Sequence, residues 1–407
     1  MCLLWLLLSF QDPQDVRVID LLGAPTLVLA VDNRAPLIKA SLFVDHGRYQ
    51  GINASAWLWM YRDPERQLER RAQQEGYQLT AQVEDHWSVL SITFPSDAAE
   101  QARALLGQIL ANRKWDLPFL KDDFRERKIR HRYQITRPEF VGKRALAQLL
   151  LHPDDPGHLP YRKPTRPKLN NQKLAADRDR ILAQAQVVLS MAGDLTEDLA
   201  RTFAEDLPKG GGSRNLPEIS PRTGGPERQT LSLPINQVWF FIGRRSLRLT
   251  EKSYGAFLMA DYALGGHFHA RLAEQLRHRD GLTYQAGTQG RPSLSPVPYY
   301  LFTYTGIATR EETRTKLEAV LNTFFEQGIT QEELDEARSY LKGAAPFRRQ
   351  SGAQRADTRS LELLLQLPQG FYDRILADVA TLSREEVNAF IQNFYHPKHF
   401  KRVEVGD

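Results

Sequence analysis

The pattern of apolar and polar positions predicts two halves with the same order of elements. In the first half, alternating or continuous apolar runs predict strands at residues 26–31 and 37–44, a hairpin at 77–94 and a strand at 187–192. Apolar positions three and four apart, with capping residues such as Asp97 and Glu100, predict helices at 54–75, 97–110 and 118–134 and a short one ending at Leu207.

The second half repeats this plan. Strands are predicted at residues 238–242, 282–287, 299–306 and 402–407. Helices are predicted to start at the capping pairs Thr309 with Glu312, Thr330 with Glu333, and Ser383 with Glu386. The order strand, helix, strand pair, helix, helix, strand thus occurs twice. The sequence therefore predicts an α+β protein of two homologous α/β sandwich-like domains.

Glycine and proline mark the boundary between these domains. Residues 209–229 contain three consecutive glycines from Gly210 and several prolines, which favour a linker over a packed element. We therefore expect domains at 17–208 and 230–407. Residues 1–16 are expected to be a separate apolar leader or a truncated signal segment, because Leu3 to Phe10 is too short to span a bilayer but is typical of the core of a secretory signal. This leader suggests an exported or periplasmic protein, although it lacks a basic start and a cleavage site.

Composition narrows the classes of function. The 407 residues are 42% apolar and 25% charged, which is typical of a globular protein. A net charge of +5 on a chain of this size does not indicate a nucleic-acid partner, and no segment predicts an integral membrane span. Cys2 is the single cysteine, so neither an intramolecular disulfide nor a thiolate metal cluster is expected.

The stretch from Leu264 to Tyr284 carries the most information about function. Four apolar residues recur every four positions and predict one side of a helix: Leu264, Phe268, Leu272 and Leu276. Gly265 and Gly266 lack side chains, so another backbone can come close to this point. Gly281 is expected to end the helix in the left-handed conformation.

Arg277 and Tyr284 lie seven residues apart across this predicted reversal, which can aim a guanidinium and a phenol at one point. A structural interpretation is equally simple. An arginine near a helix C-terminus complements the helix dipole, and a tyrosine on a strand is usually half-buried packing. Spacing alone favours this structural interpretation.

The chain resembles the pitrilysin-type zinc peptidases, in particular the subgroup that contains the mitochondrial processing peptidase. The resemblance rests on the duplicated α+β unit and on the second-half motif. The motif residues are Leu264-Gly265-Gly266, Arg271-Leu272, Leu276-Arg277, Gly281-Leu282 and Tyr284, with weaker support from Gly157-His158 and Tyr161-Arg162. His267 departs from the motif, because many relatives have a third glycine there.

Active members of this family bind zinc through an inverted motif, His-x-x-Glu-His, in the first half. The corresponding segment here, Ser55 to Arg62, contains apolar and aromatic residues instead, and the helix expected to carry the third ligand has no carboxylate at 130–134. The histidine pairs His267/His269 and His396/His399 have no carboxylate at a recognised spacing, and the first pair would point apart on a helix. We therefore expect no metal ligands and no cofactor in this chain.

The resemblance gives Arg277 and Tyr284 a role, because the family's arginine and tyrosine hold the substrate and the developing oxyanion. It implies a chain that is inactive alone and forms a heterodimer with a homologous zinc-bearing peptidase subunit. This chain would supply Arg277, Tyr284 and half of the substrate chamber, with Gly265 and Gly266 as substrate-binding positions, and the substrate would be a peptide or unfolded polypeptide. The alternative is a structural or peptide-binding protein with the peptidase fold and no catalytic share.

Overall fold

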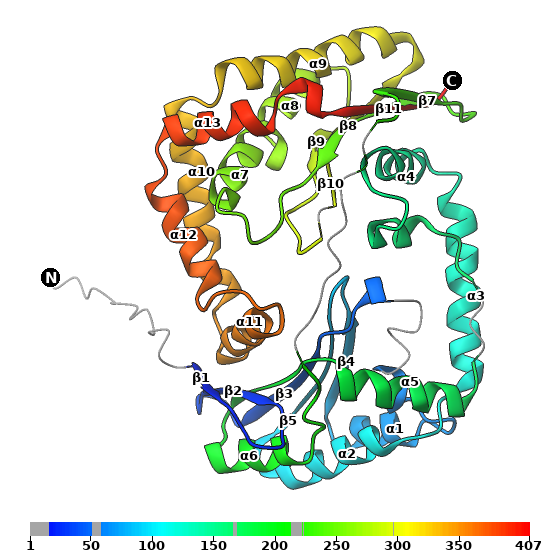
Figure 1. The fold of residues 1–407 in the computed structure, drawn as a ribbon, viewed down its shortest axis with the longest axis vertical. Helices are drawn as coiled ribbons and strands as arrows, with labels where there is room; N and C mark the ends of the chain where they lie inside the picture. Colours follow the sequence, from blue (N-terminus) through cyan, green and yellow to red (C-terminus); the bar gives the residue numbers. More distant parts are fainter. Residues whose placement is uncertain (1–15, 51–57, 166–168, 213–221, 223, 296) are drawn as a thin grey trace, which may run out of the picture. The chain divides into compact units, whose positions relative to one another are not determined.

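A computed structural model describes residues 16–50, 58–165, 169–212, 222, 224–295 and 297–407 (Figure 1). The predicted leader therefore lies, apart from Val16, outside the described residues. The chain divides into two compact units. The first comprises residues 1–120, 167–215 and 347–370, and the second comprises 121–166, 216–346 and 371–407.

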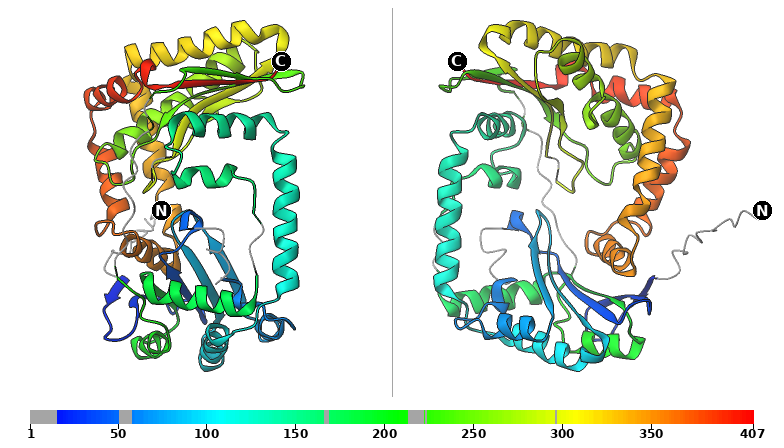
Figure 2. Two further views of the ribbon diagram at one scale, coloured as in Figure 1. Left: turned by 45° about the vertical axis from the view of Figure 1, so that its right-hand side comes forward. Right: turned by 180° about the vertical axis from the view of Figure 1, so that it is seen from behind.

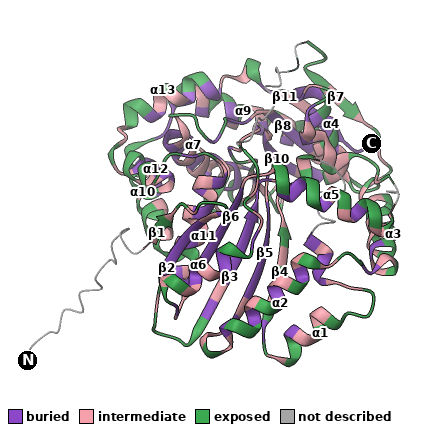
Figure 3. Ribbon diagram, turned by 60° about the horizontal axis from the view of Figure 1, so that its bottom comes forward, coloured by how far each residue is buried: buried purple, intermediate pink, exposed green. Residues whose placement is uncertain are grey.

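The first unit is built on a six-stranded sheet with the order β1-β2-β6-β3-β5-β4. Its strands are β1 (Val16–Ile19), β2 (Thr26–Val31), β3 (Leu37–Val44), β4 (Gln78–Val83), β5 (Ser88–Pro95) and β6 (Val187–Gly193). β2 and β6 run parallel, and the other neighbours are antiparallel. Figure 3 shows the central strands as buried, which follows from apolar side chains on both faces.

Helices cover both faces of this sheet. Leu27 and Leu29 point into a core shared with α2 (Ala99–Ala111), α5 (Asn171–Gln184) and α6 (Glu197–Glu205), beside the short α1 (Gln67–Gln74). Val28 and Ala30 point to the opposite face. There they pack with Ala356 and Leu364 of α11 (Gly352–Leu364), which comes from the far end of the sequence.

The second unit is built on a five-stranded sheet with the order β7-β11-β8-β10-β9. Its strands are β7 (Arg228–Leu231), β8 (Gln237–Arg245), β9 (Ala286–Gln289), β10 (Pro298–Gly306) and β11 (Lys401–Val405). β7 runs parallel to β11, and the remaining pairs are antiparallel. This order matches β2-β6-β3-β5-β4 of the first unit strand for strand, with the same directions.

Helices also cover both faces of the second sheet (Figure 2). Leu146 and Leu150 of α4 (Pro138–Leu150) pack against Phe241 and Val403 on one face. The other face is covered by a helical layer of α7 (Tyr254–Asp261), α9 (Arg310–Gln327), α10 (Gln331–Ala344), α12 (Phe371–Thr381) and α13 (Arg384–Phe394). The remaining helices are α3 (Leu117–Gln134) and the short α8 (Arg271–Ala273).

The matching strand orders confirm the predicted fold class of two homologous α/β units. The two halves also exchange one helix each, because α4 belongs to the second unit and α11 to the first. The predicted contiguous domains, 17–208 and 230–407, differ from the compact units by the two segments that carry these helices. Among the described residues, none of the helices combines the length and apolarity needed to cross a membrane.

Several predicted local details were wrong. The described part of the expected helix 54–75 has a short 3₁₀ turn at Leu58–Tyr61 and then α1 from Gln67, because Pro64 and the left-handed Arg66 (φ 54°) interrupt it. The strand expected at 282–287 begins only at Ala286. Asp97 does not cap α2, whose cap position is Ala98.

Candidate functional site

The stretch from Leu264 to Tyr284 is not one helix. After α7 it forms a π-helical turn, Tyr262–Gly266, and breaks at His267, which is extended (φ −146°, ψ 175°). It resumes with α8 and a second π-helical turn, Glu274–Arg279. The prediction of one buried apolar side holds for Leu264, Leu272 and Leu276 but is wrong for Phe268, which is 53% exposed because the break turns it outward.

Gly265 is needed for a close approach of two backbones. A β-carbon there would lie 2.8 Å from the backbone nitrogen of Thr288 in β9 and 2.9 Å from a methyl of Leu272. At Gly266 a β-carbon would lie 3.0 Å from the carbonyl oxygen of Asp261. The predicted close approach is therefore confirmed for Gly265, with β9 as the neighbour, whereas Gly266 lies close to the end of α7. Substrate binding by the two glycines stays a prediction.

Arg277 and Tyr284 meet in space. The guanidinium carbon of Arg277 lies 4.6 Å from the ring centroid of Tyr284 and 4.3 Å from that of Phe268. Tyr284 is 73% exposed, and within the described part of the chain no carboxylate pairs with Arg277. A guanidinium over aromatic faces is held by cation–π attraction while its N–H edges stay available to a ligand. Sequence reasoning found the first two residues and missed Phe268 as the third.

The reversal between Arg277 and Tyr284 is fixed by backbone bonds. Gly281 is left-handed (φ 64°), as predicted, and the Leu282 N–H donates to the Leu276 carbonyl at 2.9 Å. The Gln275 side chain and Lys316 bind the Asp280 carboxylate at 2.8 and 3.0 Å. These hydrogen bonds hold the pKa of Asp280 below its ordinary value. The loop that presents Tyr284 is therefore tied to the π-helical turn.

A half-buried carboxylate lies at the start of the first π-helical turn. The Oδ1 atom of Asp261 accepts hydrogen bonds from Thr288 at 2.6 Å and from Tyr299 at 2.9 Å. The Tyr299 hydroxyl is in turn 3.0 Å from that of Tyr395. Burial raises the pKa of Asp261 despite these hydrogen bonds. This network joins the end of α7 to β9 and β10, and so supports the glycine turn above it.

The segment where the resemblance places the zinc motif is only partly described, because Ser55 to Trp57 lie outside the described residues. In the part that is described, Met60 and Tyr61 are buried in the core of the first unit. The guanidinium of Arg62 lies 4.2 Å from the Phe119 ring centroid and 3.2 Å from the Glu69 carboxylate. Buried apolar and aromatic side chains, with the half-buried Arg62 beside them, therefore occupy the described part of this segment.

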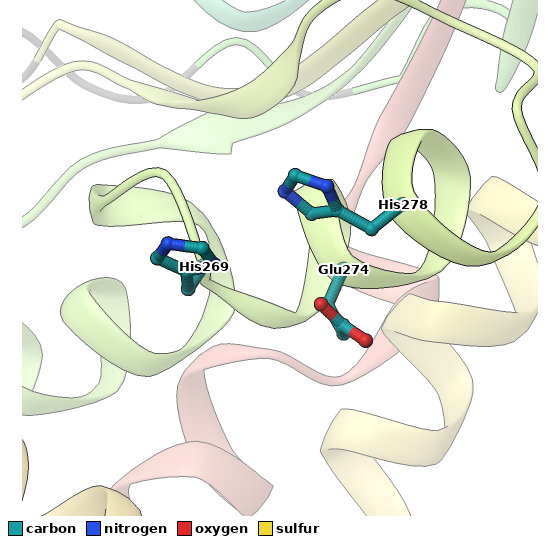
Figure 4. Close-up of side chains that lie close together, drawn as sticks. All are labelled: His269, Glu274 and His278. Atoms are coloured by element: carbon teal, nitrogen blue, oxygen red, sulfur yellow. The ribbon is translucent and has the colours of Figure 1, made fainter.

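One group of metal-ligating side chains stands out among the described residues, and sequence reasoning missed it. His269, Glu274 and His278 each offer a ligand atom within 4.8 Å of the other two (Figure 4). His267 is not part of this group. Its ring packs on that of Tyr262, with centroids 4.1 Å apart, and the extended backbone at His267, rather than a continuous helix, separates it from His269. The available signal was the four-residue spacing of Glu274 and His278.

Comparisons with known proteins agree with this architecture. Residues 168–341 match the family model described as the peptidase M16 inactive domain. A Helicobacter pylori protein named non-peptidase homolog YmxG is 32% identical over 133 residues, which are 32% of this chain and 30% of that protein. A Bacillus subtilis protein named uncharacterized zinc protease YmxG is 21% identical over 214 residues, or 52% of this chain and 51% of that protein. The matches thus span about half or less of the length of these two relatives.

A solved structure extends the likeness over the whole fold. The crystal structure of a peptidase M16 inactive domain from Pseudomonas fluorescens superposes with a TM-score of 0.83 and 19% identity, covering 96% of this chain and 98% of that one. The duplicated α/β fold is therefore shared with this M16 inactive-domain structure. Residues 168–341 match the model of the peptidase M16 inactive-domain family, which confirms the predicted resemblance at the level of the family.

Proposed function

We propose that this chain is the non-catalytic subunit of a heterodimeric zinc endopeptidase, in which a homologous partner bears the zinc. The chain contributes Arg277 and Tyr284 to the substrate site of the complex. The observation that carries the proposal is the meeting of these two side chains, with the Arg277 guanidinium 4.6 Å from the ring of the exposed Tyr284. The match of residues 168–341 to an inactive-domain family model supports it.

The chemistry fits the stabilisation of a tetrahedral intermediate. Peptide hydrolysis places negative charge on the carbonyl oxygen, and preorganised donors at that oxygen are worth roughly 10²–10³ in rate. Phe268 and Tyr284 hold the Arg277 guanidinium over their rings, so that little side-chain entropy is lost when its N–H groups meet the substrate. The Tyr284 hydroxyl is a second donor on the exposed side of the loop.

The second candidate is a structural or peptide-holding subunit without a catalytic share. The exposed aromatic and cationic surface formed by Phe268, Arg277 and Tyr284 favours this candidate as well, since such surfaces bind peptides without chemistry. The two candidates differ in the effect of replacing Arg277 and Tyr284: a catalytic share predicts a lower kcat, whereas peptide holding alone predicts only a higher KM.

The test is reconstitution with a homologue from the same genome that carries His-x-x-Glu-His, followed by cleavage of a fluorogenic peptide by the purified heterodimer. We expect Arg277→Ala and Tyr284→Phe to lower kcat by about 10-fold or more with the heterodimer intact. Arg384→Ala and Tyr340→Phe, which alter an exposed arginine and an exposed tyrosine in the same unit, should leave kcat unchanged. Unchanged kcat in the Arg277 and Tyr284 variants would leave only the structural candidate.

A further inference from the structure

The break at His267 creates an arrangement of side chains that a continuous helix would not allow. His269 follows the break, while Glu274 and His278 stand four residues apart on the second π-helical turn. One ligand atom from each lies within 4.8 Å of the other two (Figure 4). Both histidines are exposed, so their rings can rotate without disturbing the core.

We propose that His269, Glu274 and His278 bind a divalent transition-metal ion, with Zn²⁺ as the best fit. Two imidazoles and one carboxylate are a ligand set that suits Zn²⁺, Cu²⁺ and Ni²⁺ and disfavours Mg²⁺ and Ca²⁺. Ligand atoms around a tetrahedral zinc ion lie about 3.4 Å apart, given bonds of about 2.1 Å. Small rotations of two exposed rings therefore close the present separations.

Neighbouring groups fit the role of supports for these ligands. A ring nitrogen of His278 lies 3.4 Å from the Phe268 carbonyl oxygen, a partner of the kind that orients metal-bound imidazoles. The rings of His269 and His278 lie nearly parallel, with centroids 5.5 Å apart. Arg279 binds one oxygen of Glu274 at 3.1 Å, which leaves the other oxygen for a metal ion.

A cavity adjoins the site and offers room for a further ligand. It has a volume of about 610 Å³, and its lining includes His269 and Glu274 together with Arg271, Lys316 and Glu336. Three protein ligands leave a fourth tetrahedral position for water or a bound molecule. Cationic and anionic side chains in the same lining suit a small zwitterionic or carboxylate ligand at that position. The proposal stands independently of the proposed function, since metal binding by His269, Glu274 and His278 needs no partner subunit.

The test uses the full-length chain without a polyhistidine tag, after dialysis against a chelator. Co²⁺ is titrated by visible absorption, and Zn²⁺ is then added in competition. We expect one equivalent of Co²⁺ to bind, Zn²⁺ to displace it, and Mg²⁺ to leave it in place. His269→Ala, His278→Ala and Glu274→Gln should each weaken binding by at least about 10-fold. Replacing a residue that only hydrogen-bonds to a metal ligand already costs about that much.

The matched control is the double variant His396→Ala/His399→Ala, which removes the other close histidine pair, with ring centroids 5.4 Å apart. It should bind Co²⁺ like the parent chain. His278→Gln, which keeps a polar side chain, serves if an alanine variant proves unstable by circular dichroism. The proposal is overturned by the absence of saturable binding, by ligand variants that bind like the parent, or by a loss confined to the control.

Discussion

The hydroxyl of Tyr299 donates to the carboxylate of Asp261 across 2.9 Å, at the point where α7 gives way to the π-helical turn. Asp261 also accepts from Thr288, whose Cγ2 and backbone nitrogen would both lie 2.8 Å from a β-carbon at Gly265. The same buried network therefore holds both sides of the glycine contact. Its effect on stability depends on the protonation state of one carboxyl group.

Asp261→Asn is predicted to change how stability depends on pH. Burial raises the pKa of Asp261, so the folded state holds this proton more tightly than the unfolded chain. The contribution of the group is complete below its ordinary pKa of 3.8 and is lost as pH rises through the folded value. Asparagine keeps the shape and one acceptor oxygen without a charge to desolvate. The variant should gain stability relative to the parent as pH rises from 4 to 7, measured by urea unfolding.

Asp280→Asn is the matched control, with the opposite sign. Hydrogen bonds from Gln275 and Lys316 lower the pKa of Asp280, so its contribution is present above 3.8 and is lost as pH falls. This variant should be less stable than the parent at pH 7 and approach it in acid. Parallel pH profiles of Asp261→Asn and the parent would show that Asp261 is not the buried charge assigned here.

Gly265→Ala is predicted to destabilise the second unit by about 1–3 kcal/mol, as overpacking does in a tight contact. The added methyl would meet the Thr288 backbone nitrogen at 2.8 Å, and backbone cannot move aside cheaply. Gly343→Ala is the comparison, because a β-carbon at this position in α10 meets nothing within 4 Å. It should stabilise the chain by about 0.5–1 kcal/mol. Equal thermal midpoints for the two variants would refute the contact.

Strands and caps were predictable where the signal is local. The apolar runs at β2 and β3 fix their bounds, since each continuous run ends at a turn. The capping boxes at Thr330 and Ser383 form as predicted. In each, the hydroxyl oxygen accepts from the backbone N–H of the glutamate three residues on, and the glutamate side chain accepts from the backbone N–H of the capping residue. At Thr309 the same spacing fails: a 3₁₀ turn precedes α9, and the hydroxyl bonds Thr305 instead.

The sequence could not predict that α4 packs in the second unit and α11 in the first. An apolar stripe shows that a helix buries one face, but not which sheet it buries that face against. The metal-ligating group was missed for a related reason: a period of four predicts a continuous helix through Phe268. The π-helical turn at Gly265 and Gly266 packs on β9, and the apolar pattern of the predicted helix carries no information about a contact with a strand outside it.

Glu404→Gln is predicted to destabilise the second unit by about 3–5 kcal/mol at pH 7, as the loss of one partner of a buried ion pair does. The Glu404 side chain is 3% exposed and binds Arg228, Arg310 and Arg314. Burial opposes its ionisation, but the hydrogen bonds from these arginines hold its pKa below the ordinary value. Its contribution is therefore present at neutral pH and lost only as pH falls below about 4.5.

Glu311→Gln controls for the general loss of a carboxylate near Arg314. Glu311 also pairs with that arginine, but its side chain is 76% exposed. Substitutions at such sites usually change stability by less than about 0.5 kcal/mol. Urea unfolding at pH 7 compares the two variants. If both variants shift the urea midpoint equally, the burial of Glu404 does not make its ion pairs more stabilising than the exposed pair of Glu311.

Phe268→Ala is predicted to lower kcat of the reconstituted heterodimer about 2- to 5-fold, less than Arg277→Ala does. The ring lies 4.3 Å from the Arg277 guanidinium and acts only by positioning it. An exposed cation–π contact is worth about 0.5–1 kcal/mol, which sets the size of the effect. Phe268→Tyr keeps the ring face and should restore the parental kcat, whereas Phe268→Leu keeps only bulk and should not. A kcat that follows side-chain volume, with leucine as good as tyrosine, would show that packing rather than the aromatic face of Phe268 matters to Arg277.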